Sequence, residues 1–334
     1  MKKTWVIALS IFALYFVTAC SDDDNTSDPN TLLPRQSLAD EDQTLTRYTV
    51  NGDVKTFDRD YEVDPDIVSY REDKALHTRM FERFTGIVPS GRRQFVKQFT
   101  PFHGGDVIAG YVYPLNGSNR TEWNIGLDVL TMEVEEASIQ ASINNPNQDP
   151  NYVASFTTIH EYGHLLSLFA DELDLNATNC TNFESTYGCL VDDAILQAYY
   201  DEFWAADYDE YLTVLGQVGQ DGISDAWYDR DPSAFTTRYA ATDPQEDFSE
   251  SFAWFVFRNP PTENTIEDQK LNFFYDYLDL VALRTTMRQY IINNIAPSPA
   301  PVPVPSVNGN VIGSALNVNL DDIHRQCGLK KAAR

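Results

Sequence analysis

His160, Glu161 and His164 form the pattern His-Glu-x-x-His within the segment 157–169. On an α-helix, residues four apart share a face, so both imidazoles can reach one metal ion. Zinc hydrolysis needs two neutral nitrogen ligands, a third protein ligand, an open position for water and a carboxylate that moves protons. The pattern therefore predicts a zinc (Zn2+) site in which His160 and His164 are ligands and Glu161 is catalytic. The alternative is a core helix with two hydrogen-bonded histidines, which leaves Glu161 unexplained.

The residues around this pattern predict the helix that must carry it. One stripe of residues falls at helical spacing, and the two histidines fall on a different stripe together with Leu168. We therefore expect an amphipathic helix that turns one face to the core and the histidines another way. The members of the core stripe are Tyr152, Phe156, Ile159, Gly163, Leu166 and Ala170.

A third zinc ligand is required, and the segment 243–258 offers the better candidate. Asp243 is a good N-cap and Pro244 suits the first helical position, so the segment predicts a helix. Glu246 and Glu250 are four apart on one face of this largely apolar helix, where an unpaired carboxylate is costly. We favour Glu246 as the ligand.

Two other interpretations of the third ligand stay open. Glu246 could merely close a capping box with Asp243. Glu184 lies twenty residues beyond His164, at a spacing that a thermolysin-like ligand would have, but no helical pattern surrounds it.

Taken together, these residues resemble the gluzincin metallopeptidases of the anthrax lethal factor type. That family combines HExxH with a tyrosine seven residues before a ligand glutamate and a second glutamate four residues after it, the spacing of Tyr239, Glu246 and Glu250. The resemblance covers only the metal helix and residues 238–257. It implies that Tyr239 donates to the oxyanion of the tetrahedral intermediate and that Glu250 orients a ligand histidine.

The fold expected from this resemblance is α+β: a zincin-like, two-lobed metallopeptidase. A mixed sheet and the active-site helix would form the upper lobe, and the C-terminal lobe would be mostly helical. By analogy with zinc peptidases, the strand before the metal helix would present its edge to an extended substrate, and the segment 123–132 is the candidate.

Residues 1–19 predict a lipoprotein signal peptide. Two lysines precede an apolar run over 5–17, which is too short for a comfortable membrane span. The run ends in Val-Thr-Ala-Cys, which resembles the lipobox of bacterial lipoproteins and implies lipidation of Cys20. We expect a cell-envelope lipoprotein of the outer membrane, periplasmic or surface-exposed, that reaches the membrane through its lipid anchor. An ordinary secretory signal with an incidental cysteine is the alternative.

Composition divides the remainder into three parts. Residues 20–45 are polar and acidic and predict a disordered tether, whose aspartate run either resembles a lipoprotein surface-export signal or is a plain solvated linker. Residues 46–296 are globular in composition and long enough for one metallopeptidase domain of two lobes. Residues 297–334 form a proline-rich spacer and a short tail.

Local patterns predict several elements inside the globular part. Asn51-Gly52 marks the turn of a hairpin over 48–54. Strands are expected over 107–113 and 123–132, and helices over 73–84, 192–204 and within 264–295. The glycine-interrupted, acidic segment 208–231 suggests a loop near the cleft.

The cysteines fit an oxidising compartment. Cys180 and Cys189 are expected to close a loop by a disulfide, and Cys327 is left over in the tail.

The net charge of −26 limits the partners. Removing the signal removes two lysines, which gives 22 − 50 = −28 for the mature chain. This acidity excludes nucleic acid and direct binding to anionic lipid, since phosphates would be repelled. We expect a monomeric zinc endopeptidase acting on peptides or proteins. The alternatives are a zinc hydrolase of restricted non-peptide substrate and a surface-anchored binding protein with a zincin fold and little turnover.

Overall fold

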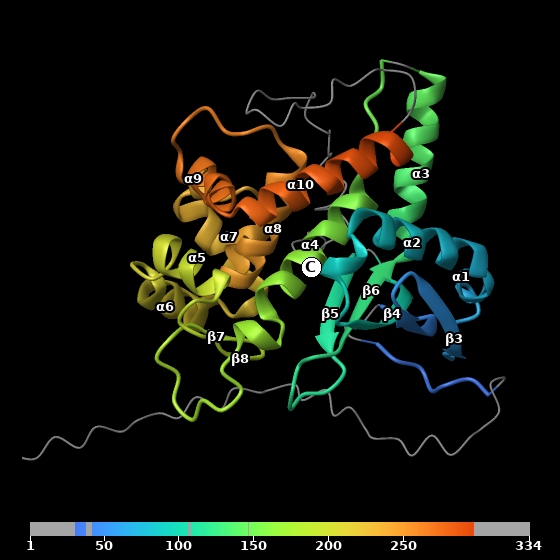
Figure 1. The fold of residues 1–334 in the computed structure, drawn as a ribbon, viewed down its shortest axis with the longest axis horizontal. Coiled ribbons are helices and arrows are strands. Elements are labelled where there is room, and N and C mark those ends of the chain that lie inside the picture. The colour runs from blue at the N-terminus through green and yellow to red at the C-terminus, as the bar shows by residue number, and fades with distance from the viewer. Residues whose placement is uncertain (1–30, 38–41, 106–107, 146, 297–334) are drawn as a thin grey trace, which may run out of the picture.

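The computed structural model describes residues 31–37, 42–105, 108–145 and 147–296 (Figure 1). The predicted signal peptide, the lipidation site Cys20 and the proline-rich tail with Cys327 lie outside the described residues. Within them, none of the helices combines the length and the apolar character that crossing a membrane requires.

One mixed sheet of six strands forms the N-terminal half of the fold. The strand order is β3-β2-β4-β6-β5, and β1 pairs with β4 beside this path. β4 and β6 are parallel and the other pairs are antiparallel, so the sheet is mixed as expected. The strands are β1 (Gln43–Thr44), β2 (Thr46–Asn51), β3 (Val54–Asp60), β4 (Val96–His103), β5 (Gly110–Pro114) and β6 (Trp123–Asp128).

The predicted hairpin is confirmed. β2 and β3 pair from Asn51 and Val54 outward, and Gly52 in the turn has a φ of 62°. Such a left-handed conformation is strained for most residues but open to glycine, which is the physical basis of the turn signal.

The strand predicted over 123–132 is present but shorter, and it is not the edge strand that the sequence analysis expected. β6 ends at Asp128, because this side chain accepts a hydrogen bond from Thr131 N (3.2 Å) and caps the following helix. β6 also lies between β4 and β5, so both of its edges are paired. The edge strands of this sheet are β3 and β5, and β5 is the one beside β6.

Four helices accompany the sheet: α1 (Val68–Glu72), α2 (Lys74–Ile87), α3 (Val129–Asn144) and α4 (Val153–Leu168). α2 confirms the helix predicted over 73–84, with Asp73 as its N-cap. In Figure 1, the sheet and α2 lie on one side of α4, and α5, α6, α7 and α9 lie on the other. α4 therefore runs between the two halves of the molecule.

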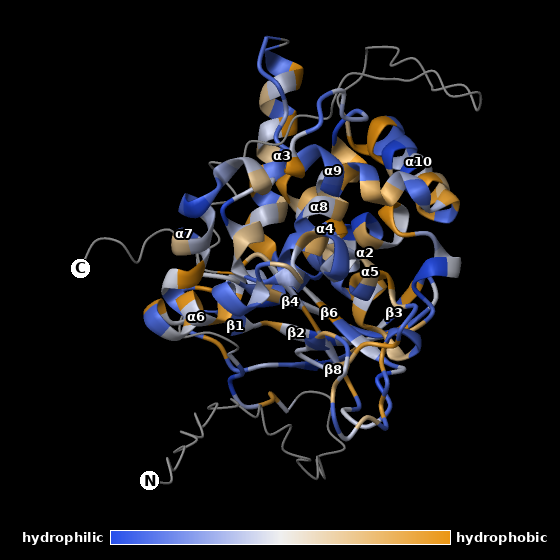
Figure 2. Cartoon of the chain, turned by 90° about the vertical axis from the view of Figure 1, so that its left-hand side faces the viewer, coloured by the Kyte–Doolittle hydropathy of each residue, from blue (hydrophilic) through white to orange (hydrophobic). Residues whose placement is uncertain are grey.

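The C-terminal half is mostly helical, as expected. Its helices are α5 (Ile195–Phe203), α6 (Tyr208–Val218), α7 (Gln220–Arg230), α8 (Pro244–Phe257), α9 (Ile266–Phe273) and α10 (Leu278–Tyr290). Short 3₁₀ turns lie at Ser90–Arg92, Ala170–Glu172, Pro232–Ala234, Tyr239–Thr242 and Phe274–Asp276, and a π-helical turn lies at Ile291–Ile295. Figure 2 shows hydrophobic and hydrophilic residues together on α3 and α10, as expected for helices with one face on the core.

The segment 208–231 is not the loop that its glycines suggested. It forms α6 and α7, which meet at Gly219, a residue with a φ of 74°. Tyr211 and Trp227 from these helices are buried against Trp204, and this packing stabilises helices whose exposed faces are polar.

The predicted tether 20–45 extends too far into the chain. Leu33 is buried, and its N–H donates to Asp60 O at 2.8 Å. Thr44 and Leu45 are also buried, and Leu45 N donates to Pro101 O at 3.1 Å. Because these apolar side chains and backbone groups pair with the sheet, the folded domain includes residues before 46.

Candidate metal centre

The HExxH pattern lies in α4, which is more deeply buried than an amphipathic helix. Leu166 is the one residue of this helix that is not buried, although the sequence pattern placed it in the core stripe. The second face is not open to solvent because α8 packs against it. A helix between two lobes has little surface left for water.

The start of α4 is held by a carboxylate from another helix. Glu135 in α3 is fully buried and accepts hydrogen bonds from Ser155 N (2.7 Å) and Ser155 Oγ (2.9 Å). Arg83 from α2 forms an ion pair with the same carboxylate. A negative charge at a helix N-terminus satisfies free N–H groups and the helix dipole, so this network fixes the position of α4.

A close crossing of α4 and α8 brings the third carboxylate to the histidines. A Cβ atom at Gly163 would lie 2.9 Å from the Cα of Ser249, closer than real side chains approach a backbone. Glycine is therefore required here for the two helices to pack at their observed distance. Sequence reasoning placed Gly163 in the core stripe and missed this function.

Two aspartates fix the start and the rotation of α8. Asp243 caps the helix by accepting from Gln245 N (2.8 Å) and Glu246 N (3.0 Å), as predicted from the sequence. The buried Asp247 lies 2.6 Å from Lys270 Nζ and accepts from Trp204 Nε1 at 2.8 Å. Neighbouring residues on a helix point about 100° apart, so the contacts of Asp247 also set the direction of Glu246. Glu246 is the one residue of α8 that is not buried.

His160, His164 and Glu246 converge on one point. The two Nε2 atoms are 3.2 Å apart, and Glu246 Oε2 lies 3.2 Å from His160 Nε2 and 3.3 Å from His164 Nε2. Among the described residues, these three form a group that could hold a metal ion. Glu184, the other candidate ligand, lies exposed in the strand β7 (Glu184–Ser185) and does not belong to this group.

This triangle suits a small tetrahedral cation. Zinc bonds of about 2.0 Å to nitrogen and oxygen place neighbouring tetrahedral ligands about 3.3 Å apart. The three observed separations are 3.2, 3.2 and 3.3 Å. Two imidazole nitrogens and one carboxylate oxygen are also the donor set that zinc takes in hydrolytic sites, which leave one position open for water.

The electrostatics of the site favour a positive charge at that point. Burial raises the pKa of Glu246, but the neighbouring His164 and His160 outweigh burial and hold this pKa well below its usual range. Burial likewise lowers the pKa of His160, while Glu246 and Glu250 outweigh it and raise the pKa above its usual value. A proton on an imidazole or a metal ion can supply the charge.

Glu161 lies on the β5 side of the histidines. A Cβ atom at Gly110 would lie 2.5 Å from Glu161 Oε1, so glycine at this position lets the carboxylate lie against β5 where it is observed. Burial raises the pKa of Glu161 to about 7, although His160 and His164 oppose the shift. Sequence reasoning missed Gly110; the available signal was a glycine where a strand begins.

Glu250 and Tyr239 also lie at this centre. Glu250 Oε1 is 3.2 Å from His160 Nδ1, on the ring nitrogen that does not face Glu246. The ring of Tyr239, on the 3₁₀ turn before α8, has its centroid 6.0 Å from that of His160. The structure thus brings together the six residues that the sequence favoured for the metal centre: His160, Glu161, His164, Tyr239, Glu246 and Glu250.

A disulfide hairpin stands beside the centre. Cys180 and Cys189 are joined by a disulfide, the pairing expected from the sequence, and enclose β7 and β8 (Gly188–Cys189). Tyr187 at the tip of this hairpin donates from its hydroxyl to Val112 O in β5 at 3.1 Å. In a chain with 18 tyrosines, no sequence signal singled out Tyr187.

Comparison with known proteins gave no match, neither to a protein-family model nor to a curated protein nor to a solved structure.

Proposed function

We propose that this protein is a zinc-dependent metallopeptidase that hydrolyses peptide bonds of peptides or proteins at the bacterial cell envelope. The observation that carries the proposal is the convergence of His160, His164 and Glu246 at separations of 3.2 to 3.3 Å, with the buried carboxylate of Glu161 beside them. The resemblance to gluzincins and a zincin-like fold belong to the same proposal.

The residues of this chain have distinct functions in it. His160, His164 and Glu246 hold the ion, and zinc, when bound, polarises the substrate carbonyl and acidifies water. Glu161 accepts the proton of the attacking water and returns it to the leaving amine. Tyr239 donates a hydrogen bond to the developing oxyanion. Glu250 orients the His160 ring through Nδ1.

The open edge of β5 supports a peptide substrate over a small non-peptide one. Ala109 O accepts from Asp128 N at 3.0 Å and Leu115 N donates to Glu122 O at 2.8 Å, so the odd-numbered residues pair with the β6 side. Alternation in an antiparallel ladder therefore turns the backbone groups of Gly110 and Val112 outward. An extended peptide can pair with such an edge next to Glu161. The edge strand expected from the sequence was 123–132, and β5 takes that place.

The test is cleavage of a mixed peptide library by residues 31–334 loaded with zinc, with Glu161→Gln as the matched variant. We expect the wild type to cut and the variant to keep one equivalent of zinc while losing turnover by about 10²-fold or more. Zinc content is measured by mass spectrometry of the metal. Retained turnover in Glu161→Gln would refute the general-base assignment.

No cuts by folded, zinc-loaded wild type would remove the peptidase proposal. A zinc hydrolase of restricted non-peptide substrate, or a surface-anchored binding protein with little turnover, would then take its place.

The lipid anchor is proposed from the sequence signals alone. A labelled fatty acid should be incorporated into the wild-type protein in bacteria and not into Cys20→Ser. Equal labelling of both proteins would contradict the anchor.

A further inference from the structure

The tip of the disulfide hairpin, residues 180–189, bridges the two halves of the molecule next to the metal centre. On one side, Thr186 N donates to Gln245 Oε1 and Gln245 Nε2 donates to Thr186 Oγ1, each at 2.9 Å. Gln245 directly precedes the proposed ligand Glu246 in α8. On the other side, the hydroxyl of Tyr187 donates to Val112 O in β5. The hairpin therefore spans from α8 to the open edge of the sheet.

The ring of Tyr187 is held from several sides. It packs edge-on against Trp123, with ring centroids 5.1 Å apart, and the guanidinium of Arg120 lies 5.9 Å from its centroid. The backbone N–H of Tyr187 donates to Ser185 Oγ at 3.2 Å. Burial, together with the nearby charge of Glu161, raises the pKa of Tyr187 to about 12, so the phenol stays a neutral donor.

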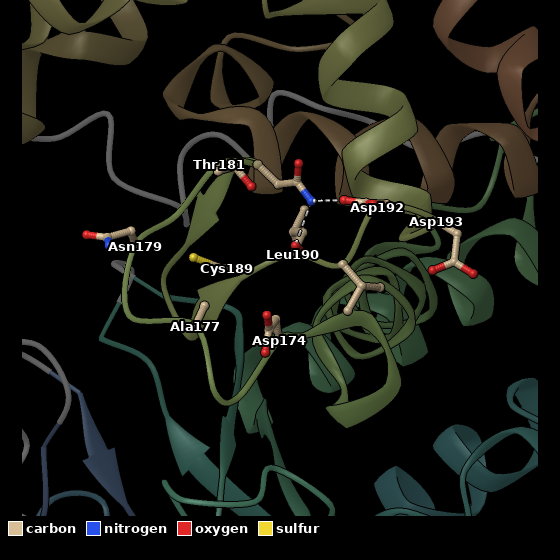
Figure 3. Close-up of a pocket in the computed structure, with 10 residues that line it drawn as sticks. Asp174, Ala177, Asn179, Thr181, Cys189, Leu190, Asp192 and Asp193 are labelled. Carbon is tan, nitrogen blue, oxygen red and sulfur yellow. Dashed lines mark hydrogen bonds between the residues drawn. The ribbon is translucent and has the colours of Figure 1, made fainter.

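The base of the hairpin is fixed as well. The disulfide joins its two ends, and Asn182 Nδ2 donates to Leu190 O at 3.0 Å and to Asp192 Oδ1 at 2.9 Å (Figure 3). The hairpin is closed at its base by the disulfide, and Tyr187 at its tip is packed and hydrogen-bonded. The ring of Tyr187 therefore acts as a fixed wall rather than as a mobile lid.

This wall stands on the edge that an extended substrate would use. The outward-facing residues of β5 are Gly110, Val112 and Pro114, by the alternation of the ladder with β6. Val112 O already accepts from Tyr187, and Pro114 has no N–H to donate. Of these three residues, Gly110 beside Glu161 is the one whose backbone N–H and C=O can both pair with a substrate. Tyr187 obstructs the edge from Val112 onward, two residues and about 7 Å along the strand from Gly110.

The direction of the obstruction follows from the direction of β5, which runs from Gly110 toward Pro114. Antiparallel pairing is the more stable arrangement per residue, so a bound substrate would run opposite to β5. Its amino-terminal part would then point toward Val112 and meet Tyr187, while its carboxyl-terminal part would leave past Gly110.

We propose that Tyr187 is a specificity-determining residue that ends the substrate cleft on the amino-terminal side. The enzyme would accept at most about two residues before the scissile bond. Its substrates are therefore peptides in which the scissile bond lies close to the free amino terminus. This inference rests on the proposed metallopeptidase function and narrows the endopeptidase expected from the sequence to an enzyme that cuts near amino termini.

The experiment starts from any library peptide that the zinc-loaded wild type cuts. The peptide is resynthesised with two or four extra residues at its amino end, or at its carboxyl end, and kcat/KM at the original bond is measured. For wild type we expect a loss of about 10-fold or more on amino-terminal extension, and little change on carboxyl-terminal extension.

Two variants separate the wall from general damage. Tyr187→Ala should remove the penalty for amino-terminal extension, because the ring is gone. Tyr187→Phe keeps the ring against Trp123 and should keep the penalty. Zinc content and melting temperature are measured for both variants, so that a misfolded protein is recognised. If Tyr187→Ala does not fold, the Arg120→Ala variant, which removes one support of the ring, should reduce the penalty.

Four outcomes would overturn the inference. If wild type cuts peptides with amino-terminal extensions equally well, Tyr187 does not limit the cleft. If carboxyl-terminal extension impairs wild type instead, the substrate lies along β5 in the opposite direction. A penalty that persists in folded Tyr187→Ala has another cause. In these three cases the metallopeptidase proposal stands. If wild type cuts no peptide at all, the metallopeptidase proposal fails and this inference fails with it.

Discussion

Glu250 Oε1 lies 3.2 Å from Nδ1 of His160, while Nε2 of the same ring lies 3.2 Å from Glu246 Oε2. One imidazole is therefore held between two carboxylates that are a helical turn apart in α8. A carboxylate near the far nitrogen favours the tautomer in which Nδ1 carries the proton and Nε2 has a free lone pair.

Replacing Glu250 by alanine should weaken zinc binding without abolishing it. We expect the dissociation constant for zinc to rise by about 10- to 100-fold, since the ring loses the group that orients it. Competition with a coloured chelator measures the change. Glu202→Ala, which removes an exposed carboxylate from α5, serves as the control and should leave the constant unchanged. Equal affinities for the Glu250 variant and wild type would contradict the orienting function.

Replacing Tyr239 by phenylalanine should slow catalysis with little effect on zinc. The variant keeps the ring near His160 and loses only the hydroxyl that would donate to the oxyanion. We expect kcat to fall by about 10²-fold while KM and zinc content change little. Steady-state kinetics on a peptide cleaved by the wild type test this. An unchanged kcat would exclude Tyr239 from the oxyanion site.

Gly163→Ala should separate α4 from α8. The new methyl group would lie 2.9 Å from the Cα of Ser249, so the helices must move apart. We expect a loss of about 1–3 kcal/mol in the free energy of unfolding and weaker zinc binding, because Glu246 moves away from the histidines. Urea denaturation and chelator competition measure the two effects.

Gly216→Ala is the matched control, because Gly216 lies in α6 and a Cβ atom there meets nothing within 4 Å. This substitution should be neutral or stabilising, by up to about 1 kcal/mol, since alanine favours a helix. A destabilisation of the same size in both variants would argue against the crossing as the cause.

The buried, neutral His77 should make the folded protein lose stability as the pH falls from 7 toward 4. Burial, aided by the charge of Lys74, lowers the pKa of this imidazole from 6.5 to about 4. The unfolded chain therefore binds a proton below pH 6.5 that the folded chain refuses until about pH 4. The contribution of His77 to stability is complete above pH 6.5 and declines as the pH falls toward 4.

The expected loss between pH 7 and pH 4 is about 3 kcal/mol, from a shift of about 2.5 pKa units at 1.36 kcal/mol each. Urea denaturation of wild type and His77→Gln across this range measures the difference between their pH slopes, which cancels the common titration of the many carboxylates. The variant is less stable at pH 7, since Tyr48 OH and Tyr70 O lose their hydrogen bonds to the ring. Parallel slopes would contradict the pKa shift.

Local patterns in the sequence were sufficient for much of the fold. Helix N-caps such as Asp73 and Asp243, and the turn at Gly52, act on residues a few positions away, so their meaning survives without the rest of the structure. The α+β architecture was expected from the resemblance of the metal-site residues to a known family, and the helices and mixed sheet of the described residues confirm that fold class. The same local reasoning overextended the strand 123–132, because the capping function of Asp128 competes with the β-propensity of its neighbours.

The sequence by itself determined which residue types stand at metal-binding spacing: the spacing of His160 and His164 is a property of one helix, and that of Glu246 and Glu250 of another. Only the tertiary structure decided that these helices meet. The crossing of these helices depends on the absence of a side chain at Gly163. The observed position of the Glu161 carboxylate likewise depends on the absence of a side chain at Gly110. The open edge of β5 and the wall at Tyr187 likewise arise from contacts between residues far apart in the chain. Periodicity tells which face of an element a residue occupies, whereas the packing of one element on another decides what that face meets.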